Sequence, residues 1–434
     1  MSNATTILVL DGQTNQALAC VRSLGRAGYR VLVASHYPRP LAAWSRYCQG
    51  RWQLHGQTRT DFSVLREWAI RAGVQLVLPL TERACWLCND EREAWEAAGI
   101  TVGCGTTEML ARAFDKAYTM QLAEACGVRI PPTAFPQSLA ECHAAADSIG
   151  FPCVIKPRQS NAWNGQSFWP DRGCAYANSH EELTALAESR RQGEDWPLLQ
   201  GYVNGQGKGA FALCDRGRVV AWFAHERLRD TNPTGSGSCL RRAVLLDERL
   251  RAQATTLLAA MQWHGPAMVE FRDDSVGAPY LMEVNGRFWT SLQLAIDAGV
   301  DFPRLWVEIL QGQASAPIAA YRDDVTLRWL WGDVKRLLYI LQGRPAGFTG
   351  AYPTLREGLR EVFGSQPPHT RLETYRADDR WPAVGEWVQG LHELWQQKVK
   401  NDDGKNSGSR ALNLVARRDV HADGMGASGT RATD

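Results

Sequence analysis

The chain has 434 residues, with 48 Lys and Arg against 46 Asp and Glu, which gives a formal net charge of +2. At about 150 residues per domain, this length predicts two to three domains. The small net charge gives no electrostatic reason to expect nucleic acid or an anionic membrane as a partner. No apolar run approaches the roughly 18 residues that span a bilayer, and the first residues lack the basic segment of a signal peptide. We therefore expect a multidomain cytoplasmic protein, of a kind most often found among enzymes.

Residues 1–105 alternate strand and helix patterns. A helix with apolar side chains at helical spacing follows the first short apolar run, and further strands and helices follow in turn. Such alternation predicts a parallel sheet covered by helices. We therefore expect a Rossmann-like α/β domain, with strands at 7–10, 30–34, 75–79 and 100–103.

The turn after the first strand lacks the chemistry of a dinucleotide site. Gly12 is its one glycine in place of G-x-G-x-x-G, and Ser35 and His36 stand where an acid would end the second strand. The domain is therefore expected to be a scaffold rather than an NAD site. Because ligands of such sheets bind at the carboxyl ends of the strands, Gly12, Thr81 and Glu82 are candidate substrate contacts. Turn and helix-cap roles explain them equally well.

The 11 cysteines are odd in number and scattered between Cys20 and Cys239, unlike the dense pattern of a disulfide framework. Cys85 and Cys88 have C-x-x-C spacing inside a stretch that is expected to be helical. A zinc site needs a second pair of ligands at a suitable distance, and none follows. We therefore expect both thiols to be packed in the core, and the sequence alone assigns them no function.

Residues 106–315 are expected to form an α+β region with antiparallel hairpins, because short apolar strands there alternate with only a few helical patterns. After it, Trp, Leu and Arg at helical spacing predict a helical region over 316–400, packed and partly solvated rather than bound to a membrane. The last stretch, 401–434, is rich in Gly, Ser, Asp and Arg and is expected to be a disordered tail.

Two strands of the α+β region carry acidic side chains inside apolar runs. Side chains two apart share a strand face, so Glu283 and Asn285 point the same way, and Glu270 joins them if its strand pairs alongside. Two carboxylates packed together repel each other unless a cation neutralises them, and with an amide oxygen they suit Mg²⁺. A solvated edge hairpin is the alternative. The residues expected to face the core instead are Val269, Phe271, Met282 and Val284.

Several other residues of the α+β region have properties suited to binding a phosphate. Arg287 can hold a phosphate or a carboxylate through two hydrogen bonds. Lys156 ends an apolar strand, where a lysine needs an anionic partner, whereas Lys116 by itself is typical of a helix surface. Glycines at 201, 205, 207 and 209 predict a flexible loop that lets backbone approach a ligand. No P-loop or protein-kinase motif is present, so another architecture would have to hold a nucleotide.

Taken together, these residues resemble the ATP-grasp superfamily, and in particular its carboxylate–amine ligases. The resemblance covers about residues 1–315 and rests on the order of its motifs: Lys116, VIKP, LLQGYV, GQGKG, a basic strand ahead of TGSGS, VEF and MEVNGRFWTS. It implies a pre-ATP-grasp α/β domain over 1–105 and, over 106–315, two α+β subdomains that clamp ATP.

The resemblance also implies roles for the matching residues, with ATP and Mg²⁺ or Mn²⁺ as cofactors. Gly201 departs from the family, whose hinge usually has an acid there, so only backbone contacts with adenine are carried over. Lys156 and Arg287 are the expected catalytic residues. The expected metal ligands are Glu270, Glu283 and Asn285, and the expected ATP contacts are Lys116, Lys156, Gln200, Gly201, Tyr202, Val203, Gly207 and Gly209.

The substrate side is less defined. The segment 225–229, with Arg241 and Arg242, is basic and lies beside a glycine–serine loop. A basic pocket there would hold an anionic substrate such as an amino acid, and solvated strand ends explain it equally well. His225, Arg227 and Gly237 are the candidate substrate contacts.

The implied function is an ATP-dependent ligase that phosphorylates a carboxylate to an acyl phosphate and joins it to an amine, releasing ADP and phosphate. An enzyme acting on bicarbonate, like carbamoyl-phosphate synthase or a biotin carboxylase, is one alternative, and a non-catalytic ATP-binding protein is another. Small-molecule substrates are the expected partners, and a homodimer is the commonest assembly by base rate. The sequence names neither the carboxylate nor the amine.

Overall fold

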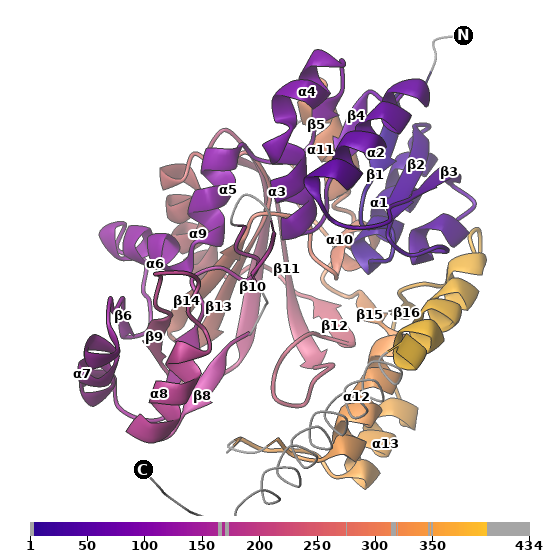
Figure 1. The fold of residues 1–434 in the computed structure, drawn as a ribbon. Helices are drawn as coiled ribbons and strands as arrows, with labels where there is room; N and C mark the ends of the chain where they lie inside the picture. The colour runs from indigo at the N-terminus through magenta and orange to yellow at the C-terminus, as the bar shows by residue number, and fades with distance from the viewer. Residues whose placement is uncertain are drawn as a thin grey trace, which may run out of the picture. The chain divides into compact units, whose positions relative to one another are not determined.

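The computed structural model describes residues 4–163, 167–169, 173–274, 276–313, 318, 320–345, 348 and 350–396. The chain forms two compact units, Met1–Gly385 and Glu386–Asp434. In the second unit the described residues are helical, and the predicted tail at 401–434 lies outside the described residues. Within the described residues, the first unit holds three sheets (Figure 1). Among the residues that the structure describes, no helix combines the length and apolar character needed to cross a membrane.

The first sheet and its helices are built from β1 (Thr6–Val9), α1 (Asn15–Arg26), β2 (Arg30–Ser35), η1 (Leu41–Trp44), β3 (Cys48–Gln53), α2 (Arg59–Arg71), β4 (Leu76–Leu78), α3 (Glu82–Asp90), α4 (Arg92–Ala97) and β5 (Thr101–Val102). The strands are parallel in the order β3-β2-β1-β4-β5. β1 and β4 are buried throughout, as in a sheet covered on both faces. The predicted α/β fold is confirmed. β3 has no signal in the sequence, because its residues alternate between half-buried and exposed and form no apolar run.

The second sheet is antiparallel, in the order β6-β9-β7-β8, and α7 and α8 cover one of its faces. Because side chains alternate along a strand, Ile155 packs against these helices while Lys156 lies on the opposite face. The elements are β6 (Thr133–Ala134), α7 (Leu139–Ile149), β7 (Cys153–Lys156), β8 (Ala175–Ala177), α8 (His180–Glu188) and β9 (Leu198–Gly201).

The third sheet has seven strands in the order β14-β13-β10-β11-β12-β15-β16. Its centre is buried on both faces: Ala210 and Ala212 of β10 belong to one core with the helix α9, whereas Phe211 and Leu213 belong to another with Trp289. The elements are α5 (Thr107–Phe114), α6 (Lys116–Ala125), β10 (Gly207–Asp215), β11 (Arg218–Arg229), β12 (Leu240–Ala243), α9 (Glu248–Ala260), β13 (Gly265–Asp273), β14 (Pro279–Asn285), β15 (Thr326–Arg328) and β16 (Thr370–Leu372).

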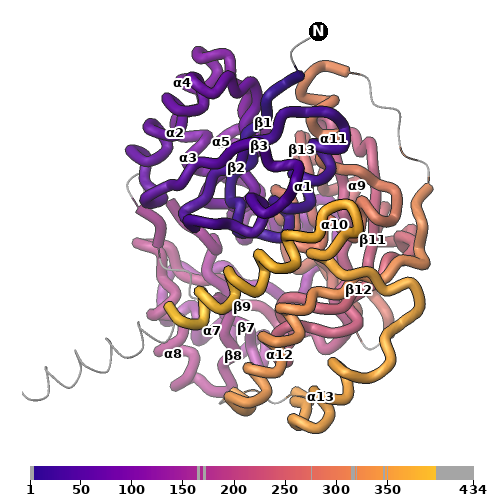
Figure 2. The backbone as a smooth tube through the Cα atoms, turned by 90° about the vertical axis from the view of Figure 1, so that its right-hand side faces the viewer, coloured from indigo at the N-terminus to yellow at the C-terminus, as the bar shows by residue number. Residues whose placement is uncertain are grey.

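The remaining helices of the first unit are α10 (Leu292–Ala298), α11 (Phe302–Leu310), α12 (Leu330–Gln342) and α13 (Leu355–Phe363). α1 packs beside α10 and α11, which brings the first sheet against the third (Figures 1 and 2). The helical prediction for 316–400 is incomplete, because β15 and β16 lie in that range and extend the third sheet. The domain boundaries at 105 and 315 stay predictions.

One buried ion pair and several hydrogen bonds connect the segment 373–379 to the first sheet's domain. Arg22 of α1 has no exposed surface and donates to Asp379 Oδ2 at 2.8 Å. It also donates to the carbonyl oxygens of Glu373 and Thr374. Since burying a charge is costly unless it is paired, these contacts specify one position for the segment.

Candidate functional site

A cavity of about 330 Å³ lies between the second and third sheets. One wall comes from β7, β8, β9 and the residues that follow β9, and the other from β10, β11, β13, β14 and the loop 235–237. Residues more than 100 positions apart in the sequence thus meet in one place. The predicted site residues that line the cavity are Lys156, Gln200, Gly201, Tyr202, Val203, Gly207, Arg227, Gly237, Glu270 and Glu283.

The acidic side chains meet as the hairpin pattern predicts. β13 and β14 pair so that Glu270 stands opposite Glu283. Asn285 donates from Nδ2 to Glu270 Oε1 at 3.3 Å and to Glu283 Oε1 at 3.0 Å, so one amide nitrogen reaches both carboxylates. The prediction that Met282 faces the core is wrong, because the register shifts after Glu270 and Met282 lines the cavity. Val269 and Val284 are buried in the core as expected.

The two carboxylates have opposite electrostatic environments. Burial and the nearby charge of Glu283 raise the pKa of Glu270, although Arg227 at 3.2 Å partly offsets them. Burial also acts to raise the pKa of Glu283, but the charge of Lys116 and the hydrogen bond from Asn285 lower it below its usual value. Glu283 is therefore the more readily ionised of the two carboxylates. A cation bound beside the pair would offset the repulsion between them.

Both predicted lysines lie close enough to Glu283 for their charges to act on it. Lys156 donates from Nζ to Gln200 Oε1 at 2.6 Å, and burial lowers its pKa. Lys116 is buried and donates from Nζ to Ser160 Oγ at 2.9 Å. The helix position of Lys116 gives no hint of this burial, so only its place in the motif order indicates a role.

The predicted hinge is the end of β9 and the residues after it. Gln200 is buried, and its Nε2 donates to Thr133 Oγ1 at 2.9 Å, so its side chain braces Lys156. The backbone N–H of Gly201 donates to Pro132 O at 2.8 Å, and a Cβ there would stand 3.3 Å from the Pro132 ring. The Pro132 ring therefore leaves little room for a side chain at position 201. This explains why a glycine stands where the resemblance leads us to expect an acid.

The glycine-rich loop prediction is wrong for three of its four members, since Gly201 ends β9. Gly207 and Gly209 lie in β10, where Gly209 pairs with Glu270 on one side and with His225 on the other. A Cβ on Gly209 would stand 2.9 Å from the Phe211 ring, which explains the glycine by packing. Gly205 does lie in the turn before β10, and a Cβ there would stand 1.6 Å from Asp273 O.

The predicted substrate residues separate in the structure. Arg227 and Gly237 line the cavity, together with Gly235 and Ser236 of the predicted glycine–serine loop. Arg272, which no sequence pattern marks, lines it as well. His225 lies outside the lining: it is buried, stacked on Phe211, and its Nε2 is 2.8 Å from Ser291 Oγ.

Two arginines of the predicted basic pocket have structural partners instead. Arg229 pairs with Asp333 of α12 at 2.9 Å, and Arg241 is buried in an ion pair with Glu373. Both acids come from the C-terminal region. The basic residues of the strands therefore predict a pocket for an anionic substrate, although two of them are neutralised by these distant acids. Arg242 pairs with Glu226 at the surface.

Arg287 connects the acidic pair to the first sheet's domain. Its Nη2 donates to Asn285 Oδ1 at 3.1 Å and stands 3.6 Å from Glu82 Oε1. Asn161, which no motif marks, donates from Nδ2 to Glu82 Oε2 at 3.0 Å. Of the three candidates in the first domain, Glu82 therefore reaches the site, whereas Thr81 caps α3 and Gly12 packs against the Val33 side chain.

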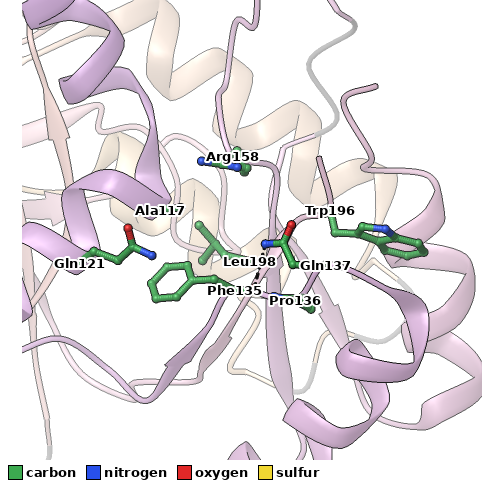
Figure 3. Close-up of a pocket in the computed structure, with 8 residues that line it drawn as sticks. All are labelled: Ala117, Gln121, Phe135, Pro136, Gln137, Arg158, Trp196 and Leu198. Atoms are coloured by element: carbon green, nitrogen blue, oxygen red, sulfur yellow. Dashed lines mark hydrogen bonds between the residues drawn. The ribbon is translucent and has the colours of Figure 1, made fainter. Parts of the chain in front are cut away.

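A second cavity, of about 130 Å³, lies beyond α6 and β9 (Figure 3). Arg158, a cationic side chain that lines this cavity, is paired with Asp115 at 2.6 Å and with Asp195 at 2.8 Å. None of the predicted site residues is among those that line it, so the cavity of about 330 Å³, which they do line, is the candidate site.

The fold thus places a cavity between two sheets, lined by the paired carboxylates and by Lys156. The family model described as "ATP-grasp in the biosynthetic pathway with Ter operon" matches residues 198–332. Biotin carboxylase from Campylobacter jejuni has the same fold, with a TM-score of 0.60 at 16% identity over 74% of each chain. N5-carboxyaminoimidazole synthetase from Staphylococcus aureus has a TM-score of 0.57 at 14% identity, over 74% of this chain and 80% of that one.

Curated relatives are formate-dependent phosphoribosylglycinamide formyltransferases. Those of Paraburkholderia xenovorans and Burkholderia mallei are 28% and 30% identical over 168 residues, which is 38% of this chain. The match spans 40% of the length of each relative. Residues 198–332 are therefore similar to ATP-grasp proteins, and the solved structures share the fold of the chain.

Proposed function

We propose that the chain is an ATP-dependent ligase that converts a substrate carboxylate into an acyl phosphate and joins the acyl group to an amine. The observation that carries this proposal is that Glu270, Glu283 and Lys156 line one cavity, with the charge of Lys116 close enough to act on Glu283. Such a cluster of cations beside an acidic pair suits a nucleoside triphosphate and its metal ion.

The residues present fit Mg²⁺ by their chemistry. The carboxylates of Glu270 and Glu283 both lie within hydrogen-bond reach of one Asn285 nitrogen, so a cation near that position would contact both. Asn285 turns its Oδ1 toward Arg287, and it would have to turn its amide to act as the third ligand. When bound, Mg²⁺ would neutralise charge on the ATP phosphates. Mn²⁺ suits the same oxygen ligands.

The chain's own residues account for the remaining contacts with ATP. Lys116 and Lys156 would hold phosphate oxygens, because Lys156 lines the cavity and the buried Lys116 acts on Glu283 beside it. The backbone of Gly201 to Val203 would hold adenine, as the edge of β9 opens into the cavity there. Tyr202, edge-on to Tyr176 with ring centroids 5.9 Å apart, closes the same side.

The reaction requires positioning more than acid–base catalysis. A carboxylate oxygen attacks the γ-phosphorus, and the bond from that phosphorus to ADP breaks. The amine nitrogen then attacks the acyl carbon, and phosphate leaves with the electron pair of the carbon–oxygen bond. Arg227 and Arg272, beside the loop at 235–237, would hold the carboxylate, and Arg287 would neutralise the acyl phosphate.

The amine would enter from the side of the first sheet's domain. Glu82 is buried and faces Arg287 there, with Asn161 as its second partner. A carboxylate at that position would hold an ammonium group. This assignment places the amine across Arg287 from the acidic pair, where it would meet an acyl group held at Arg227.

The experiment is ADP release by the full chain with Mg-ATP and a panel of carboxylates. The panel includes formate, which the names of the curated relatives suggest, bicarbonate and the amino acids, each with and without an amine. Turnover that needs both a carboxylate and an amine supports the ligase. Turnover with bicarbonate alone favours the carboxylase-like alternative, and tight ATP binding without turnover on any acid favours a non-catalytic role.

Glu283→Ala is the sharpest variant, and we expect it to lower ADP release by about 100-fold or more. Glu226→Ala is its matched control, because Glu226 lies on the same sheet and is paired with Arg242 outside the cavity. If both variants keep the parent rate, the acidic pair does not serve ATP. Light scattering of the same samples tests the homodimer, which stays a prediction.

A further inference from the structure

A third cysteine lies beside the Cys85–Cys88 pair. Cys85 and Cys88 are both on α3 with no exposed surface, and Cys104, two residues after β5, is 9% exposed. Asn89, one turn after Cys85, donates from Nδ2 to Cys85 O at 3.0 Å and to Cys104 Sγ at 3.2 Å, which places the two cysteines side by side. Among the described residues, no group of three or more His, Cys, Asp or Glu side chains is arranged to hold a metal ion. The cluster therefore points to thiol chemistry rather than to zinc.

Polar side chains from α3 and α4 surround the Cys104 sulfur. Asn89 donates from Nδ2 to Cys104 Sγ at 3.2 Å, and Arg92 Nη2 stands 3.8 Å from it. Arg92 is held in place because it also donates to Cys104 O at 2.8 Å and Gly105 O at 3.0 Å. Donors and a fixed positive charge around one sulfur are the surroundings of a reactive cysteine.

The three thiols differ accordingly. Burial acts to raise the pKa of Cys104, but the hydrogen bond from Cys85 and the charge of Arg92 outweigh it and lower the pKa. The hydrogen bond to Cys104 and burial raise the pKa of Cys85, and burial raises that of Cys88. Cys104 is therefore the more readily ionised thiol of the two, and Cys85 beside it has the position of a resolving thiol.

We propose that Cys104 and Cys85 form a reversible disulfide when the protein meets a peroxide. The Cys104 thiolate attacks one oxygen of hydrogen peroxide, the O–O bond breaks, and Cys104 sulfenic acid and hydroxide form. The Cys85 sulfur then attacks the Cys104 sulfur, the S–O bond breaks, and the thiol proton leaves with the hydroxyl group as water. Two thiols are oxidised by two electrons and one peroxide is reduced.

The crosslink would join two elements of the first sheet's domain next to the candidate site. Cys85 is one helical turn from Glu82, which faces Arg287, and Cys104 starts the chain that leads to α5.

The test treats the full chain with increasing hydrogen peroxide, blocks free thiols under denaturing conditions and identifies the crosslinked peptides by mass spectrometry. We expect a Cys85–Cys104 peptide that disappears after treatment with dithiothreitol. Cys88→Ser is the matched control on the same helix and should keep the crosslink, whereas Cys104→Ser should abolish it. Cys85→Ser should leave a sulfenic acid on Cys104 that dimedone traps.

Two further measurements keep the result decisive. Asn89→Ala removes a donor to the Cys104 sulfur and should slow crosslinking several-fold, with circular dichroism showing that the variant is folded. Cys174, which is exposed, gauges the oxidant within the same molecule. The proposal is overturned if Cys174 is fully oxidised while Cys85 and Cys104 are still free, or if Cys88 replaces either of them in the crosslink.

Discussion

Arg22→Ala should destabilise the protein strongly, because the side chain has no exposed surface and is fully used. Its Nε donates to Asp379 Oδ2 at 2.8 Å, and its Nη1 donates to Glu373 O at 3.1 Å. Its Nη2 donates to Thr374 O at 2.6 Å and to Asp379 O at 3.0 Å. The substitution leaves three buried carbonyl oxygens without this donor and removes the cation beside Asp379.

The expected cost follows from that count. Removing one partner of a buried ion pair costs about 3–5 kcal/mol, because the other charge stays buried. Ser45 Oγ at 2.8 Å and the backbone N–H of Arg46 at 2.8 Å still reach Asp379, so we expect the lower half of that range, about 3–4 kcal/mol. Arg26→Ala is the matched control on the same helix, because its pair with Asp378 is half-exposed and worth about 0.2–1 kcal/mol.

The assay is equilibrium unfolding in urea, with the free energies compared at an unchanged m-value. A difference of about 2–4 kcal/mol between the two variants supports the cost expected from the buried contacts. Equal costs within about 1 kcal/mol would refute it, since burial would then add nothing to an ordinary surface pair.

Three other predictions concern the cavity. The pKa of Glu270 is raised above 4.5 in the folded protein, so its contribution to stability is full below pH 4.5 and is lost as pH rises through the raised value. Thermal unfolding against pH should therefore slope downward there, and Glu270→Gln or added Mg²⁺ should flatten it; an unchanged slope contradicts the assignment. The pKa of Lys156 is lowered from 10.5 by burial, so the charged form costs stability as pH falls through the lowered value. Lys156→Met should then gain about 1 kcal/mol at neutral pH and lose ADP release, and a destabilised variant would count against the burial argument. Gly205→Ala forces a Cβ to within 1.6 Å of Asp273 O and should cost about 1–3 kcal/mol. Gly207→Ala, whose nearest contact is 3.9 Å away, should cost less than about 0.5 kcal/mol, and similar costs for both would show that the turn moves freely.

The parts of the site that follow from strand alternation could be predicted. Glu270 and Glu283 face each other because the hairpin pairs as its apolar pattern requires. The position of Met282 could not be predicted, since a register shift leaves no mark in the pattern. Nor could the strand at Gly209, because glycine suits both a loop and a close approach to the Phe211 ring.

The roles of residues whose partners lie far along the chain could not be predicted from the sequence. Arg241 looks like part of a basic pocket, but Glu373 neutralises it from the C-terminal region. Glu82 looks like a helix-start residue, and it stands 3.6 Å from Arg287, about 200 positions later. Three cysteines spread over 20 positions form one cluster only because α3 packs beside the chain that follows β5.

The sequence by itself determined the parallel α/β domain, the acidic hairpin and the likeness to ATP-grasp enzymes, because these depend on periodicity and on short motifs within one or two elements. Only the tertiary structure decided which arginines face the cavity and which hold the C-terminal region. It also decided that Glu82 joins the site and that Cys104 joins Cys85. The reason is physical: the charge and reactivity of each of these groups depend on neighbours that folding brings from distant parts of the chain.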